Sequence, residues 1–165
     1  MQNQNRPQGS WRIIVFGCIG LLVIFADQLS KTWIRANLAP GQSLFDAGFF
    51  QIVHVQNSGA AFGIFKGYSF TLTIIALIGI VVILLLVFFL HRRWPFLDSM
   101  LARVAIGLVT GGTIGNLIDR ISMGHVTDFI NFKVWPVFNV ADSAVTVGVI
   151  IIVYRILYLA KNDKH

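Results

Sequence analysis

Asp128 and Asp142 lie on either side of a short segment near the end of a chain that contains no glutamate. Strongly apolar runs precede and follow them. Ionisable groups at such positions are costly unless they are paired or solvated, so they are candidates for a functional site. A pair of carboxylates that shares one proton can supply both a general base and a general acid. The residue types therefore indicate acid–base chemistry.

The two aspartates differ in their expected surroundings. Asp142 follows Asn139 by three residues at the start of an apolar run, so the positive end of a helix would favour its ionised form. The same spacing is also that of a simple helix cap. Asp128 lies within the largely apolar segment Val126–Ile130, where a carboxyl group holds a proton more easily. Spacing alone leaves the cap and the catalytic pair equally open.

Small and polar residues form two adjoining stripes on the apolar run that comes before Asp128. Four-residue spacing aligns the first stripe, and the second follows one position later: Gly107, Gly111, Gly115 and Asp119, then Gly112, Asn116 and Arg120. Glycines at this spacing permit close helix packing, and the polar residues could hydrogen-bond across a helix bundle. Alone, the stripes favour that structural interpretation over a binding site.

One more pair of charges lies inside an apolar run. Asp27 and Lys31 are one helical turn apart and can form an ion pair. A structural ion pair at a membrane boundary is the favoured interpretation, with a supporting role for both residues.

Other chemistries have weaker signals. His54 and His125 lack the paired helical spacing of a zinc protease, and His125 with Asp128 gives fewer ligands than zinc usually takes. No serine stands in a recognisable nucleophile motif, and no glycine-rich segment has a phosphate-loop pattern. We expect no metal and no cofactor.

The composition is that of an integral membrane protein. Of 165 residues, 56% are hydrophobic and 12% are charged, which is too little polar surface for a soluble domain of this size. The net charge of +6 comes without a long basic run, so nucleic acid is not an expected partner. We expect a single membrane domain over residues 1–165.

The hydropathy pattern predicts an all-α membrane protein with four transmembrane helices. The spans are expected at about 12–36, 70–90, 99–119 and 140–160. Long loops at about 37–69 and 120–139 lie on one side, and residues 1–10 form a flexible polar tail. The extended-looking Phe49–Gln56 and the turn at Asn57–Gly59 predict a small interfacial β-sheet in the first loop.

Charge asymmetry predicts the orientation of the spans. Eight basic residues fall on the side of the termini and five on the other side, so the positive-inside rule puts both termini in the cytoplasm. Most acidic residues gather on the extracytoplasmic side: Asp27, Asp46, Asp119, Asp128 and Asp142. We therefore expect the polar chemistry on the outer side.

An ordered set of motifs from Asp27 to Asp142 resembles the bacterial lipoprotein signal peptidases, also called signal peptidase II. The motifs are Asp27-Gln28 with Lys31, Asn57-Ser58-Gly59-Ala60-Ala61-Phe62, Gly111-Gly112 with Gly115-Asn116 and Asp119-Arg120, Val126-Thr127-Asp128-Phe129, and Phe138-Asn139-Val140-Ala141-Asp142. Each fragment alone is weak, but their order and their common position at the span ends make the combination specific.

The resemblance implies a membrane aspartic endopeptidase with Asp128 and Asp142 as its catalytic residues. It implies further that a second group shapes or supports the substrate site: Asn57, Gly112, Asn116, Arg120, Asn139, Asp27, Lys31 and Asp119. The implied substrate is a prolipoprotein cleaved on the amino side of a diacylglyceryl-modified cysteine. The implied location is the bacterial inner membrane, with the site facing outward. We also expect membrane lipid as a partner and a monomeric protein.

Two other functions fit parts of the pattern. In a small proton- or cation-coupled transporter, the outer carboxylates would bind an ion, but they cluster on one side instead of stepping through the bilayer. A lipoprotein-binding assembly factor would retain the substrate without cutting it.

Overall fold

The computed structural model describes residues 10–59, 67–90 and 99–162. Its elements are α1 (Ser10–Asn37), β1 (Ser43–Asp46), β2 (Gln51–Asn57), α2 (Ser69–Leu85), the π-helical turn η2 (Leu86–Leu90), α3 (Met100–Met123), β3 (Val126–Asn131) and α4 (Val140–Asn162). Residues 1–9 of the predicted tail and the motif residues Ala60–Phe62 lie outside this description.

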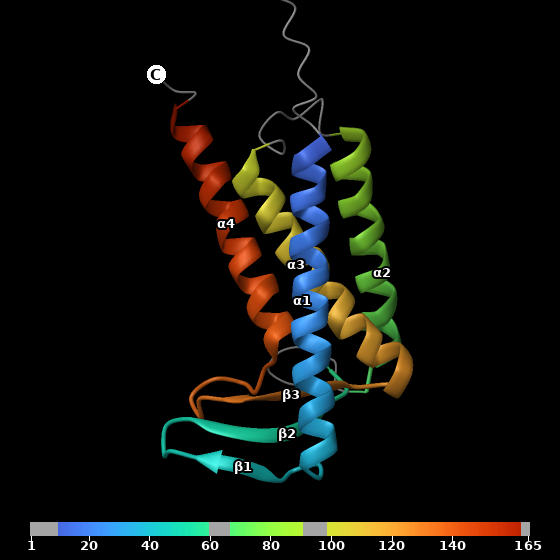
Figure 1. Ribbon diagram of the computed structural model, residues 1–165, viewed down its shortest axis with the longest axis vertical. Helices are drawn as coiled ribbons and strands as arrows, with labels where there is room; N and C mark the ends of the chain where they lie inside the picture. The colour runs from blue at the N-terminus through green and yellow to red at the C-terminus, as the bar shows by residue number, and fades with distance from the viewer. Residues whose placement is uncertain (1–9, 60–66, 91–98, 163–165) are drawn as a thin grey trace, which may run out of the picture.

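Within residues 10–59, 67–90 and 99–162, four helices are long and apolar enough to cross a membrane, as predicted, so the chain is a multi-pass membrane protein. Figure 1 shows the sheet at one end of the bundle, opposite the start of α1 and the end of α4. The third helix runs past its predicted end near residue 119 and continues to Met123. It stops at Gly124, whose φ of 75° gives the left-handed C-cap that glycine adopts easily.

Helix α3 is the centre of the bundle and packs against α1, α2 and α4. Of the 18 most apolar consecutive residues of α3, 61% are buried. The corresponding share in each of the other three spans is 6–17%. Its glycine stripe makes this packing possible. A Cβ on Gly111 would lie 2.6 Å from the Gly20 carbonyl oxygen of α1, and one on Gly148 of α4 would lie 2.7 Å from the Ala105 carbonyl oxygen. The predicted structural role of the glycines is confirmed.

The predicted small sheet is present, but it has a strand that the sequence did not predict. The order is β1-β2-β3, all antiparallel, and β3 comes from the second long loop. Asp128 lies on this strand, opposite Val55 of β2. The Asn57–Gly59 turn is confirmed, because the Asn57 side-chain oxygen accepts a hydrogen bond from the Gly59 N–H at 2.9 Å.

An apolar cluster joins the sheet to the helices. Ile34 and Leu38 at the end of α1 pack with Phe129 of β3, and Ile130 and Val140 lie against them. Because Phe129 follows Asp128 and Val140 begins α4, this cluster fixes the strand and the helix that carry the two aspartates.

We predict that Gly111→Ala lowers the free energy of unfolding by about 1–3 kcal/mol, because the added methyl meets backbone atoms of α1 that cannot rotate away. Thermal unfolding in detergent measures this. Gly79→Ala in α2 is the matched control, since a Cβ there meets nothing within 4 Å and should leave the Tm unchanged or slightly raised. Equal Tm values for the two variants would contradict the packing argument.

Candidate active site

Asp128 is buried, with 2% of its surface exposed, and each of its oxygens accepts an amide hydrogen bond. Asn139 Nδ2 donates to Oδ1 at 2.7 Å, and Asn57 Nδ2 donates to Oδ2 at 2.9 Å. Burial, and next the negative charge of Asp142, raise the pKa of Asp128 to about 7, while the two amide bonds act in the opposite direction. The expectation that Asp128 holds a proton more easily than usual is confirmed.

Asp142 lies in the first turn of α4 and completes a capping box with Asn139. The Asp142 N–H donates to Asn139 Oδ1 at 2.9 Å, and the Asn139 N–H donates to Asp142 Oδ2 at 3.3 Å. The capping interpretation of this spacing is therefore confirmed. The cap also fixes the direction in which the Asp142 carboxylate points.

A chain of two amides connects the aspartates. Asn139 Nδ2 donates to Asp128 and also to Asn116 Oδ1, at 3.0 Å. Asn116 Nδ2 in turn donates to Asp142 Oδ1 at 2.8 Å. Lys31 Nζ gives Asn116 Oδ1 a second donor at 2.8 Å, so the oxygen faces Lys31 and Asn139 while the nitrogen faces Asp142. The amide of Asn116 is thus oriented by its neighbours.

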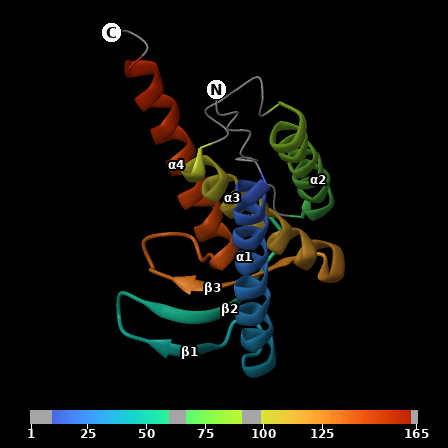
Figure 2. The ribbon, with the colours of Figure 1, turned by 45° about the horizontal axis from the view of Figure 1, so that its top comes forward.

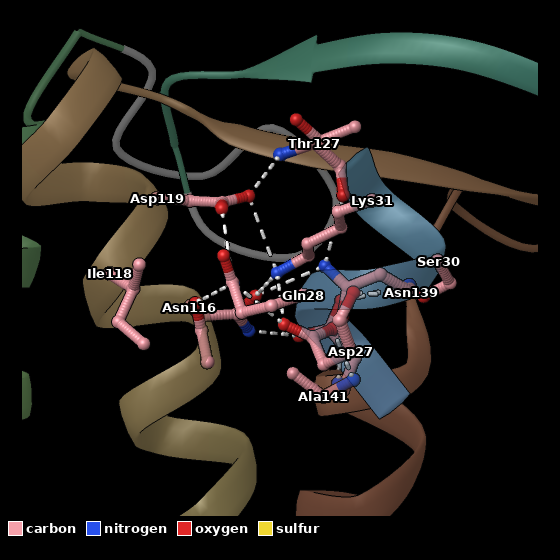
Figure 3. Close-up of polar contacts among 12 residues, drawn as sticks. Asp27, Gln28, Ser30, Lys31, Asn116, Ile118, Asp119, Thr127, Asn139 and Ala141 are labelled. Carbon is pink, nitrogen blue, oxygen red and sulfur yellow. Dashed lines mark hydrogen bonds and ion pairs between the residues drawn. The ribbon is translucent and has the colours of Figure 1, made fainter. Parts of the chain in front are cut away.

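Lys31 is fully buried. Figure 3 shows its side chain near those of Asp27 and Asp119. Its Nζ lies 2.8 Å from Asp27 Oδ2 and 3.4 Å from Asp119 Oδ2. The predicted Asp27–Lys31 ion pair is confirmed, and Asp119 joins it. All three side chains are within 1% of complete burial, so each charge depends on its partners for stabilisation.

Asp27 also reaches across the bundle to the start of α4. Its Oδ1 accepts a hydrogen bond from the Ala141 N–H at 3.0 Å, one of the backbone donors that the first turn of a helix leaves without an internal partner. Gly115 leaves room for this carboxylate, because a Cβ there would lie 2.5 Å from Asp27 Oδ2. Asp27 therefore holds in place the helical turn that carries Asp142.

Three residues that contact Asp119 were not among the predicted site residues: Gln28, Arg35 and Thr127. Gln28 Nε2 donates to Asp119 Oδ1 at 3.2 Å, and Arg35 Nη1 lies 3.3 Å from the same oxygen. Thr127, next to Asp128, donates its N–H to Asp119 Oδ2 at 2.9 Å. The sequence could have indicated Arg35, because it follows Lys31 by four residues and so lies on the same helix face as Asp27 and Lys31.

The two aspartates line one pocket of about 560 Å³. Among the predicted site residues, Asn57, Asn116 and Arg120 line it too. Arg120 Nη2 lies 3.4 Å from the Gly59 carbonyl oxygen, and its Nε is buried with no hydrogen-bond partner among the described residues. The pocket therefore combines two carboxylates, donor amides and one cation.

The other predicted residues lie behind the pocket and do not line it: Asp27, Lys31, Gly112, Asp119 and Asn139. Gly112 lets two helices approach, because a Cβ there would collide with the Ala141 carbonyl oxygen and lie 2.8 Å from Val145 Cγ2. The remaining four form the hydrogen-bonded support described above. The structure thus separates the predicted set into a lining group and a supporting group.

Comparison with known proteins gives a consistent result. The family model described as signal peptidase (SPase) II matches residues 19–158. Curated relatives named lipoprotein signal peptidase include one from Dehalococcoides mccartyi strain 195, 48% identical over 93% of this chain and 94% of its own, and one from Moorella thermoacetica, 40% identical over 86% and 92%. A solved structure described as a bacterial membrane enzyme superposes with a TM-score of 0.79 at 32% identity, covering 89% of this chain and 90% of that one.

We predict that Asp27→Ala lowers the free energy of unfolding by about 3–5 kcal/mol, because it leaves a buried ammonium with one carboxylate fewer and removes the acceptor of the Ala141 N–H. Chemical or thermal unfolding in detergent measures the loss. Asp46→Ala removes an aspartate whose side chain is 47% exposed, and it should cost much less. A similar loss for both variants would refute the supporting role of Asp27.

Proposed function

Because the chain belongs to the signal peptidase II family, a family of proteases that remove signal peptides from lipoproteins, we propose that Asp128 and Asp142 are its catalytic pair. The observation that carries this proposal is that two carboxylates in unlike surroundings line one pocket. Family membership favours hydrolysis over the transporter and over the binding factor that the sequence left open.

In the proposed first step, a water molecule lies between the carboxylates. Asp142 acts as the ionised base and takes a proton from the water. Its two oxygens accept hydrogen bonds from the Asn116 side-chain amide and the Asn139 backbone N–H. The resulting hydroxide attacks the scissile carbonyl carbon while Asp128 donates its proton to the carbonyl oxygen. A tetrahedral diol forms. At this point Asp142 is protonated and Asp128 is ionised.

The second step returns the protons. Asp142, now protonated, gives its proton to the leaving amide nitrogen, and Asp128 takes back a proton from one hydroxyl of the diol. The C–N bond breaks and a carboxylic acid and an amine leave the site. Burial of Asp128 supports this cycle, because a carboxyl group with a pKa of about 7 is both a competent acid and a competent base near neutral pH.

The Asn116–Asn139 amide chain supports the assignment of different roles. Its two donors fix the directions of both carboxylates before substrate binds, so little reorganisation is needed during the reaction. Arg120 brings a positive charge to the same pocket, where it is suited to bind a peptide carbonyl or the developing oxyanion.

The substrate we propose is a prolipoprotein whose cysteine carries diacylglycerol, cleaved on the amino side of that cysteine. The pocket wall includes Thr146 and Val147, which are exposed on the side of α4. This supports lateral entry from the bilayer. A lipid anchor would hold the scissile bond at a fixed depth, so that positioning contributes to the rate.

We also propose an orientation and a setting. The positive-inside rule favours cytoplasmic termini, which would put the pocket and the sheet at the extracytoplasmic surface of the bacterial inner membrane. Exposed Leu44, Phe45 and Phe49 at the sheet are suited to the lipid interface. A monomer would suffice, since one chain contributes every residue named for the reaction.

We predict that Asp128→Asn and Asp142→Asn each lower turnover of a diacylated prolipoprotein by more than about a thousandfold, because an amide can neither accept nor donate the shared proton. Mass spectrometry of the products measures cleavage by purified protein, and size-exclusion chromatography checks the fold. Asp46→Asn, an exposed aspartate outside the pocket, is the matched control and should keep its kcat. Full turnover by both pocket variants would end the assignment.

We predict that kcat/KM falls as the pH rises through about 7, since Asp128 must be protonated in the free enzyme and burial raises its pKa to that value. The apparent value belongs to the coupled pair. The hydrogen bond from Asn57 stabilises the ionised form of Asp128, so Asn57→Ala should move this limb to higher pH. A shift to lower pH, or none, would show that Asp128 is not the acid.

A further inference from the structure

One wall of the pocket is the loop that joins β3 to α4. Trp135, Pro136, Val137 and Phe138 all line the pocket. Backbone hydrogen bonds to β3 fix the carboxyl-terminal end of this loop. The Phe138 N–H donates to the Ile130 carbonyl oxygen at 3.0 Å, and the Ile130 N–H donates back at 2.8 Å. Phe138 is therefore fixed beside the strand that carries Asp128.

The amino-terminal end of the loop turns sharply at Lys133. Its φ of 62° is the one positive value found for a non-glycine residue in the described part of the chain. Lysine rarely adopts this left-handed conformation, so neighbouring contacts must stabilise it. One such contact is the Lys133 N–H, which donates to Asn131 Oδ1 at 2.8 Å.

A second contact reaches another part of the fold. Lys133 Nζ donates to both oxygens of Asp46, at 2.7 and 2.9 Å. Asp46 ends β1, and its Oδ1 also accepts the Gly48 N–H at 2.8 Å, which fixes the carboxylate within the β1–β2 turn. Figure 2 shows this turn and the β3–α4 loop at the same end of the sheet.

An aromatic contact joins the same two turns. The rings of Phe50 and Phe132 lie 5.3 Å apart, and Phe132 stacks on Phe138 at 6.0 Å. The ion pair and the rings therefore connect the β1–β2 turn to the pocket wall independently. Between Lys133 and Phe138, the residues that line the pocket have an anchored position on each side.

We propose that the Asp46–Lys133 ion pair positions the pocket wall formed by residues 135–137 for binding of the polypeptide substrate. The inference rests on the proposed function, since it takes this pocket as the peptide site. The pair controls binding and leaves the chemical step unaffected, because neither residue lines the pocket and the directions of Asp128 and Asp142 are fixed by a separate amide chain.

The effect is expected to be modest. The two side chains are 38% and 47% exposed, and pairs of this kind are weakened by water and by salt. Loss of the pair should raise KM by about two- to fivefold, with kcat unchanged, which is the range that an exposed pair allows.

Reversal of the charges tests the proposal. Asp46→Lys and Lys133→Asp should each raise KM for a diacylated prolipoprotein, and the double variant, which restores the pair with exchanged signs, should return KM toward that of the unchanged protein. Unchanged KM in the single variants, a fall in kcat alone, or a double variant no better than the singles would each overturn it. The double variant exchanges the positions of the long and the short side chain, so it changes shape as well as charge. Lys133→Gln removes only the positive charge of the ion pair and should still raise KM.

Two controls separate this result from other effects. Lys161→Asp makes the same charge change on an exposed residue at the far end of α4, and its KM should stay unchanged. If Lys161→Asp raised KM as much as Lys133→Asp, the effect would come from net charge, and the positioning role of the Asp46–Lys133 ion pair would be overturned. Asp142→Asn tests the catalytic proposal separately, because its turnover fails or persists whatever the charge-reversal variants do.

Discussion

The structure depends on one buried ammonium group. Lys31 is completely buried, and moving such a charge out of water is costly unless it is well paired. Asp27 and Asp119 supply the opposite charges, and each carboxylate also accepts a backbone N–H, from Ala141 and from Thr127 respectively. A single side chain of α1 therefore fixes the relative positions of α3, β3 and α4, on which both pocket aspartates depend.

Two interpretations of Asp142 that competed at the level of sequence turn out to be compatible. The capping box with Asn139 gives the carboxylate its direction, and the Asn116 amide gives it a donor on its other oxygen. Asp128 is held differently, by burial on a strand and by two side-chain amides. The difference between a helix start and a buried strand creates the asymmetry that the proposed acid and base require.

Local patterns were the predictable part of this fold. The four spans, the Asp27–Lys31 pair and the Asn139 cap each depend on residues close together in the chain, and all are present. Strand β3 was not predicted, because its six residues form a strand only by pairing with β2, far away in sequence. The contacts of Arg35 with Asp119 and Thr127 were missed for the same reason. The assignment of catalytic roles came from the resemblance of whole motifs and remains a proposal.

Helix α2 differs from its three neighbours in how little of it the rest of the protein touches. Ser69–Leu85 has no buried residue. Most of its side chains are therefore constrained only by the need to dissolve in hydrocarbon, which many apolar residues satisfy equally well. Random mutation should consequently be tolerated along this helix as long as hydropathy is kept, whereas the glycine stripe of α3 leaves almost no freedom of choice. Sequence drift within one chain is thus expected to be rapid in α2, at the edge of the bundle, and slow in α3, at its centre.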